Sequence, residues 1–102
     1  MITIAITGAG GRMGQRLVAL AARDDALKIV AALERAECGS IGRDAGQVAG
    51  IGAIGIPVAS ELQTALQVLI DFTVPAGTRH WLQVCRERGI AMVIGTTGLI
   101  ES

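Results

Sequence analysis

The sequence has few aromatic residues: its 102 residues include one phenylalanine, one tryptophan and no tyrosine. The core must therefore be filled by isoleucine, valine, leucine and alanine, which is typical of a parallel sheet covered by helices. An excess of charge is also missing, because nine basic and nine acidic residues cancel. This neutrality, and the lack of a basic patch interleaved with aromatic residues, argue against nucleic acid or an anionic membrane as partner.

Long apolar runs, a signal peptide and metal-ligand spacings are lacking as well. Arginine, aspartate or glycine interrupts each apolar run before it reaches the length of a membrane span, and the first residues do not have the pattern of a signal peptide. We interpret the two cysteines, Cys38 and Cys85, as free thiols rather than as a disulfide. We therefore expect a cytoplasmic protein with no metal site and no membrane segment.

Strand and helix patterns alternate along the chain. Strands are predicted for residues 2–7, 27–34, 56–59, 68–72 and 90–94. Helices are predicted for residues 12–23, 60–66 and 75–88. This alternation predicts an α/β domain of Rossmann-like fold, a doubly wound parallel sheet with helices on both faces.

The segment from Arg35 to Gly55 breaks this alternation. Six of its residues are glycines, so we expect a loop with one helical turn near residues 44–48. A loop of this length in a small domain is either functional or mobile. Asp44 and Glu37 lie in it with no partner visible in the sequence.

A glycine-rich turn, Gly8-Ala9-Gly10-Gly11-Arg12-Met13-Gly14, joins the first predicted strand to the first predicted helix. Gly8 fits the tight turn out of the strand, Gly11 a close approach of the backbone to a pyrophosphate, and Gly14 close packing of the helix on the sheet. The helix N-terminus would add unpaired N–H groups and a positive dipole. On this motif alone, an ordinary strand–helix turn that favours glycine is an equal alternative.

Two charged residues strengthen the dinucleotide interpretation. Glu34 lies twenty residues after Gly14, at the end of the second predicted strand. A dinucleotide fold places an acid there to accept hydrogen bonds from the adenosine ribose. Arg35 could pair with the extra phosphate of NADP, so both NADH and NADPH are candidate cofactors. The alternative is that both residues are solvated at the surface.

Two further turns are expected at the same edge of the sheet, Asp71-Phe72-Thr73 and Gly95-Thr96-Thr97-Gly98. Phe72 could pack on a ring of the ligand, and Thr96 and Thr97 could offer it hydroxyl groups and backbone amides. Taken singly, Asp71 and Thr73 are more often caps of the next helix than ligand contacts. His80, the one histidine, is expected to lie partly exposed on that helix, away from this edge.

Five segments together resemble the dihydrodipicolinate reductase family. They are Gly8-Ala9-Gly10-Gly11-Arg12-Met13-Gly14, Ala32-Leu33-Glu34-Arg35, Gly42-Arg43-Asp44-Ala45-Gly46, Ile70-Asp71-Phe72-Thr73-Val74-Pro75 and Val93-Ile94-Gly95-Thr96-Thr97-Gly98. The resemblance implies a reductase that passes hydride from NADH or NADPH to a cyclic dicarboxylate intermediate of diaminopimelate and lysine biosynthesis. It implies cofactor contacts at Gly8, Ala9, Gly10, Gly11, Arg12, Met13, Glu34, Arg35, Phe72, Thr73, Gly95, Thr96 and Thr97.

The resemblance also implies what this chain does not contain. The family's substrate domain, with its catalytic histidine-rich motif and lysine, comes later in the sequence, so we expect residues 1–102 to be the dinucleotide-binding domain alone. We expect no catalytic residue in it, a sheet that is incomplete at its C-terminus, and no activity without the remainder of a homotetrameric enzyme. His80 inherits no role. The alternatives are another NAD(P)-dependent dehydrogenase and a non-catalytic nucleotide- or coenzyme A-binding module.

Overall fold

The computed structural model describes residues 1–72 and 75–94 and shows the predicted alternation of strands and helices. The strands are β1 (Ile2–Thr7), β2 (Leu27–Leu33), β3 (Val58–Ala59), β4 (Val68–Asp71) and β5 (Ala91–Ile94). The helices are α1 (Arg12–Ala22), α2 (Ala45–Val48) and α3 (Pro75–Arg88). Most predicted elements are present, and several of them end within one or two residues of the predicted bounds.

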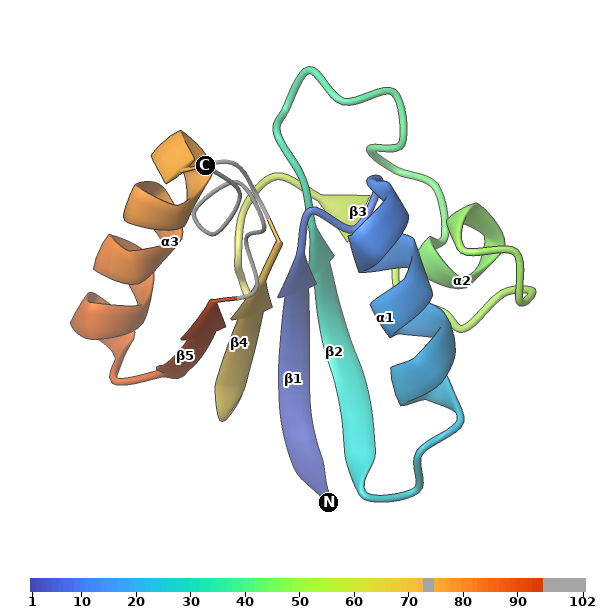
Figure 1. Ribbon diagram of the computed structural model, residues 1–102, viewed down its shortest axis with the longest axis horizontal. Helices are drawn as coiled ribbons and strands as arrows, with labels where there is room; N and C mark the ends of the chain where they lie inside the picture. Colours follow the sequence, from blue (N-terminus) through green and yellow to red (C-terminus); the bar gives the residue numbers. More distant parts are fainter. Residues whose placement is uncertain (73–74, 95–102) are drawn as a thin grey trace, which may run out of the picture.

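All five strands lie parallel in one sheet, in the order β3-β2-β1-β4-β5 (Figure 1). At the centre, Ile6 of β1 is in register with Ala32 of β2 and with Ile70 of β4. After β1, the chain adds β2 and β3 on one side of this strand, and then adds β4 and β5 on its other side. The turns after β1 and β4 therefore separate at the carboxyl edge, which is where ligands bind in sheets of this kind.

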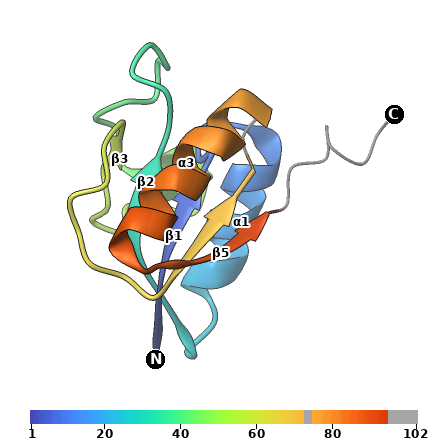
Figure 2. The ribbon, with the colours of Figure 1, turned by 90° about the vertical axis from the view of Figure 1, so that its left-hand side faces the viewer.

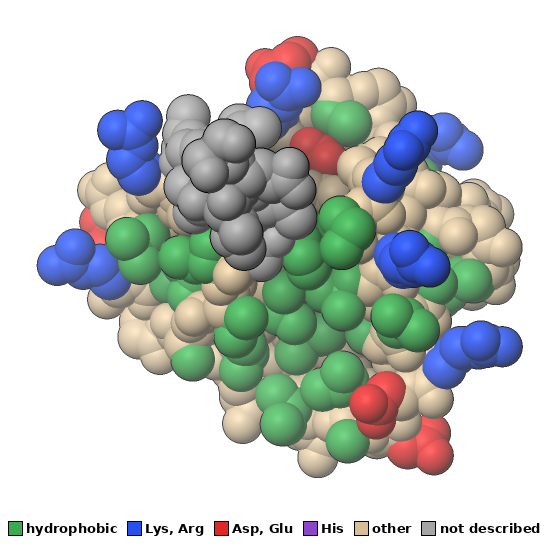
Figure 3. All heavy atoms as spheres, in the orientation of Figure 1, with side chains coloured by type: hydrophobic (Ala, Val, Ile, Leu, Met, Phe, Trp, Pro, Cys, Tyr) green, Lys and Arg blue, Asp and Glu red, His purple; other side chains and the backbone are tan. Residues whose placement is uncertain are grey.

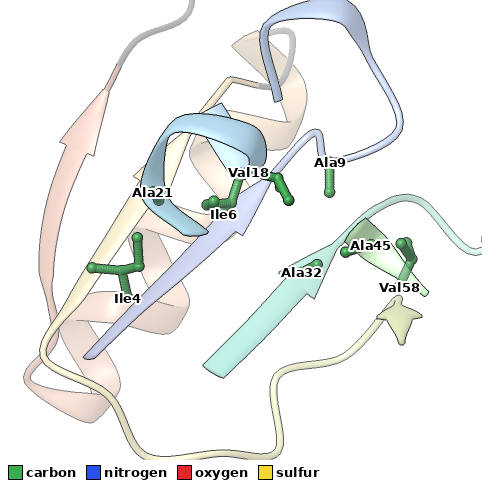
Figure 4. Close-up of a cluster of buried hydrophobic side chains, with 8 residues drawn as sticks. All are labelled: Ile4, Ile6, Ala9, Val18, Ala21, Ala32, Ala45 and Val58. Carbon is green, nitrogen blue, oxygen red and sulfur yellow. The ribbon is translucent and has the colours of Figure 1, made fainter. Parts of the chain in front are cut away.

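The two faces of the sheet are covered by different helices, as expected (Figures 1 and 2). Ile4 and Ile6 point toward Val18 and Ala21 of α1 (Figure 4). Ala5, between the two isoleucines, belongs to the opposite cluster with buried residues of β2, β4 and α3, which are Leu33, Leu69, Trp81 and Cys85. Successive strand residues point to opposite faces, so an uninterrupted apolar β1 serves both clusters.

Part of the face seen in Figure 1 is apolar and open to solvent. Figure 3 shows hydrophobic side chains gathered across its middle, between α1 and α3. Val93 and Ile94 of β5 are 53% and 46% exposed. In the described part of the chain, no helix covers β5 on the side where α1 covers β1.

The helix predicted for residues 60–66 is wrong. The structure has no helix between β3 and β4, and the Leu62 carbonyl instead accepts a hydrogen bond from Arg88 Nη1 of α3 at 2.6 Å. The reason is the distance that this connection must cover. Three strand spacings of about 4.8 Å already amount to about 14 Å sideways, and the chain must also return along the length of the strands. Eight residues span about 12 Å as a helix but about 26 Å when extended, so only an extended segment reaches β4.

The loop between β2 and β3 is held by Asp44, and the expectation that this residue has no partner is wrong. Its Oδ1 accepts hydrogen bonds from the N–H groups of Gly46, Gln47 and Ile54, and its Oδ2 from those of Gly55 and Ile56, at 2.7–3.2 Å. The same carboxylate caps α2, the helical turn expected here. One side chain therefore joins the start of α2 to the last residues of the glycine-rich loop.

Replacing Asp44 with alanine is expected to destabilise the fold above about pH 4 and to matter less in acid. The backbone N–H groups, that of Ile54 foremost, lower the pKa of Asp44 from its ordinary value of 3.8, against an opposing effect of desolvation. A carboxylate with a lowered pKa stabilises the fold above its ordinary pKa, and that stabilisation is lost as pH falls through the folded value. Urea unfolding at pH 7 and pH 3 measures the difference. Asp25→Ala, at an exposed turn residue, is the control, and an equal Asp44→Ala effect at both pH values would contradict the prediction.

Candidate functional site

A hollow lies at the carboxyl edge of the sheet, where the glycine turn, the ends of β2 and β4, and α3 meet. Its volume is about 780 Å³, which lies within the range of about 300–1,000 Å³ for small-molecule sites. The residues that line it are Gly8, Gly11, Glu34, Arg35, Ala36, Ser60, Glu61, Phe72, Gly77, His80 and Trp81. Five of the residues predicted to contact a cofactor therefore share one cavity: Gly8, Gly11, Glu34, Arg35 and Phe72.

The glycine turn can form only with glycine at two of its positions. Gly8 has φ +72°, and a Cβ there would lie 2.9 Å from the Phe72 carbonyl oxygen. A Cβ on Gly14 would lie 2.0 Å from the Gly8 carbonyl oxygen. The first position lets the turn approach the end of β4, and the second lets α1 pack against the turn. Close contacts between backbone atoms therefore require glycine at Gly8 and Gly14 of the sequence motif.

The start of α1 faces the hollow without a capping side chain. Gly11 is the N-cap residue and makes no side-chain cap, and the first turn contains no acidic residue. Arg12 and Met13, both predicted cofactor contacts, lie exposed in this turn. The N-terminal N–H groups and the helix dipole make such a helix end favourable for an anion.

Glu34 lies directly against the glycine turn. Its Oε2 accepts a hydrogen bond from the Gly10 N–H at 2.9 Å, and its Oε1 accepts one from the Arg35 N–H at 3.1 Å. Next to this contact, the buried Ala9 donates its N–H to the Leu33 carbonyl at 3.2 Å. Gly10 therefore holds the carboxylate of a residue 24 positions later in the chain. This carboxylate lies at the rim of the hollow, at the end of the strand where the sequence spacing predicted it.

Phe72 is positioned by the buried carboxylate that precedes it. Asp71 accepts hydrogen bonds from the hydroxyl groups of Thr7 and Thr78, each at 2.5 Å. These bonds join the ends of β1 and β4 to α3, and all three side chains are buried. No sequence pattern predicted this cluster, because Thr7 and Thr78 are far apart in the chain and neither belongs to a motif.

The position expected for His80 is wrong in one respect. The residue is exposed on α3 as predicted, but it lines the hollow rather than lying away from it. Its ring packs edge-on against Trp81, with the centroids 4.7 Å apart. Gly77, His80 and Trp81 are spaced three and four residues apart, so they share one face of α3. That spacing, on a helix that begins at the ligand-binding edge, was the signal available in the sequence.

Other predicted features have mixed outcomes. Thr73, Gly95, Thr96 and Thr97 lie outside the described residues. Cys38 is half-buried and Cys85 is buried, and both are free thiols as expected. Burial, and then the charge of Asp71, raise the pKa of the Cys85 thiol. Within the described ranges no cluster of side chains could hold a metal ion, and no helix is long and apolar enough to cross a membrane.

Comparison with known proteins gives matches along nearly the whole chain. Residues 2–102 match the family model described as "Dihydrodipicolinate reductase, N-terminus". The 4-hydroxy-tetrahydrodipicolinate reductase of Acinetobacter baumannii is 50% identical over 101 residues, and that of Alkalilimnicola ehrlichii is 49% identical over 102. These alignments cover 96% and 97% of this chain but 37% and 38% of the relatives. The chain therefore spans less than two fifths of their length.

Solved structures show the same fold. A dipicolinate-bound dihydrodipicolinate reductase from Paenisporosarcina sp. TG-14 is 26% identical, with a TM-score of 0.71 over 96% of this chain and 38% of that chain. An aspartate semialdehyde dehydrogenase with NADP from Candida albicans is 18% identical, with a TM-score of 0.74 over 100% of this chain and 31% of that chain. The second match shows the likeness of fold alone.

Proposed function

The chain belongs to the dihydrodipicolinate reductase family, of which it represents the N-terminal part, and we propose from this premise that it is the NAD(P)H-binding domain of a 4-hydroxy-tetrahydrodipicolinate reductase. One observation carries the proposal: the Glu34 carboxylate and the glycine turn are hydrogen-bonded to each other at the rim of one hollow. A dinucleotide needs an anion site and a ribose acceptor side by side, and this contact provides them.

The pyrophosphate would lie at the start of α1. Gly8, Ala9, Gly10, Gly11, Arg12 and Met13 form the turn and the first helical residues there. The uncapped N–H groups of the helix would donate to the phosphate oxygens, and the Arg12 guanidinium would add a positive charge. The missing Cβ of Gly11 leaves the backbone open to the ligand.

The adenosine ribose would lie at Glu34. A carboxylate has about four lone-pair positions, and two hydrogen bonds to backbone N–H groups occupy part of them. The remaining positions can accept hydrogen bonds from the ribose hydroxyls. The adjacent Arg35 lines the same hollow and would pair with the 2′-phosphate of NADPH, so the site would accept either cofactor.

The reacting end of the cofactor would lie beyond Phe72. Phe72 lines the hollow at the end of β4, and we propose further contacts from Thr73, Gly95, Thr96 and Thr97, which follow β4 and β5 in the sequence. The bound nicotinamide supplies hydride for a cyclic dicarboxylate substrate, a class that the dipicolinate-bound relative supports. For the whole enzyme, rather than for this chain alone, we propose a substrate site, a homotetramer and a cytoplasmic location. The chain alone is expected to bind cofactor without steady-state turnover.

Titration with NADH and NADPH tests the cofactor site. Trp81, the one tryptophan, lines the hollow, so its fluorescence should report binding. Glu34→Ala should weaken both cofactors about tenfold or more, because hydrogen bonds to a charged group are lost. Arg35→Ala should weaken NADPH about tenfold and leave NADH within about twofold, because only NADPH carries the 2′-phosphate.

The matched controls are Glu87→Ala and Arg86→Ala, which remove the same charges from exposed positions near the end of α3. Both should bind the two cofactors as the unchanged chain does. Failure of the unchanged chain to bind either cofactor would contradict the proposed function. Unaltered binding by Glu34→Ala and Arg35→Ala would contradict the roles of these two residues.

A further inference from the structure

Arg35 is engaged by a neighbour on its own loop. Its Nε lies 3.5 Å from Oε1 of Glu37, and the two side chains are 73% and 72% exposed. The backbone creates this contact, because the Arg35 carbonyl accepts a hydrogen bond from the Cys38 N–H at 2.9 Å. This tight turn brings Glu37, two residues after Arg35, back beside the guanidinium. The ion pair is thus a product of the turn that follows β2.

We propose that Glu37 sets the preference between NADH and NADPH by competing with the 2′-phosphate for Arg35. The inference rests on the proposed function and adds a residue that determines specificity. A phosphate binds arginine best through two parallel N–H bonds, and one such pair uses Nε with a terminal nitrogen. Glu37 occupies the Nε edge. To bind along this edge NADPH must displace the Glu37 carboxylate, whereas NADH has only a hydroxyl at that position and leaves the pair intact.

The other charges around the hollow increase the effect of Glu37. Glu34 and Glu61 also line it, and Arg35 is the arginine among the lining residues. A phosphate monoester carries a charge of about −1.5 to −2 at pH 7. With Arg35 paired to Glu37, the incoming phosphate meets two further carboxylates and no unpaired arginine of the lining. Removing the Glu37 charge frees the guanidinium of Arg35, the arginine among the lining residues.

Glu37→Gln tests the competition while keeping the size of the side chain. The dissociation constants of NADH and NADPH would be measured from Trp81 fluorescence at low and high salt. We expect the ratio of the two constants to shift about two- to fivefold toward NADPH, the range of an exposed ion pair. The shift should shrink at high salt, because exposed charges are screened. Glu87→Gln, the same change on α3, should leave the ratio unchanged.

The double variant Glu37→Gln/Arg35→Ala distinguishes pairing from simple repulsion. If Glu37 acts through Arg35, adding Glu37→Gln to Arg35→Ala has no further effect on the ratio. A full shift in the Arg35→Ala background would overturn the proposal, since the Glu37 charge would then act directly on the phosphate. An unchanged ratio in Glu37→Gln alone would also overturn it. Either result leaves cofactor binding intact, whereas loss of binding to both cofactors in the unchanged chain refutes the proposed function itself.

Discussion

Gly14→Ala is expected to destabilise the fold by about 3 kcal/mol or more, the upper range for a forced overpacking. The added Cβ would lie 2.0 Å from the Gly8 carbonyl oxygen, 2.6 Å from its carbonyl carbon and 2.9 Å from the Ala9 Cα. These atoms belong to the backbone, so no side chain can rotate away. Either α1 must move off the sheet or the glycine turn must deform. In a domain of this size the Tm should fall by about 12 °C or more, as thermal unfolding would measure.

The same substitution should weaken NADH and NADPH alike, because it displaces the turn that would hold their shared pyrophosphate. Gly39→Ala is the matched control, since a Cβ there meets nothing within 4 Å. This variant should be neutral or more stable by up to about 1 kcal/mol, because alanine restricts the unfolded chain. Equal Tm values for Gly14→Ala and Gly39→Ala would show that α1 does not pack on the turn as described.

Asp71→Ala is expected to cost about 3–6 kcal/mol of folding stability, the sum of two hydrogen bonds to a charged group at about 1.5–3 kcal/mol each. The substitution leaves the buried hydroxyls of Thr7 and Thr78 without the oxygens they donate to. It also removes the hydrogen bonds that join the ends of β1 and β4, next to Phe72, to α3, which carries Trp81. Urea unfolding would measure the loss of stability, and cofactor titration the effect on the hollow.

Single removals of each donor provide the comparison for Asp71. Thr7→Val and Thr78→Val keep the shape of the side chain and remove one hydroxyl each, so each should cost less than Asp71→Ala, about 1–3 kcal/mol. Asp25→Ala, at an exposed position, should stay within about 0.5 kcal/mol of the unchanged chain. An Asp71→Ala effect as small as that of Asp25→Ala would contradict a supporting role for the buried carboxylate.

The sequence predicted those parts of the site that depend on local pattern. The β-branched run of β1, the glycines after it and the position of Glu34 all follow from rules that relate neighbouring residues to one element. Their convergence in one hollow follows from the parallel topology, because parallel strands end at the same edge. The interpretation of Glu34 as a residue near the turn could therefore be made before any distance was known.

The remaining features depend on contacts that no local pattern records. The extended segment after β3 reflects the distance to β4, which depends on the order of strands in space. Asp44 bonds to N–H groups ten to twelve residues away, and Asp71 to a hydroxyl 64 residues away. His80 and Trp81 gain their place in the hollow only because α3 packs beside β4. In each case the tertiary arrangement determines the local structure or the contacts of the residue, and helix or loop propensity has little influence.

The central position of β1 has a consequence for the order in which the molecule can assemble. Of the five strands, β1 is the first to leave the ribosome, yet it pairs on one side with β2 and on the other with β4. Its second partner is made only after a further 60 residues, and such distant pairings slow the formation of a fold. The glycine turn is therefore synthesised before Phe72 and Trp81, which line the same hollow. During synthesis, a nucleotide could stabilise this nascent chain only after α3 has emerged, late in the translation of these residues.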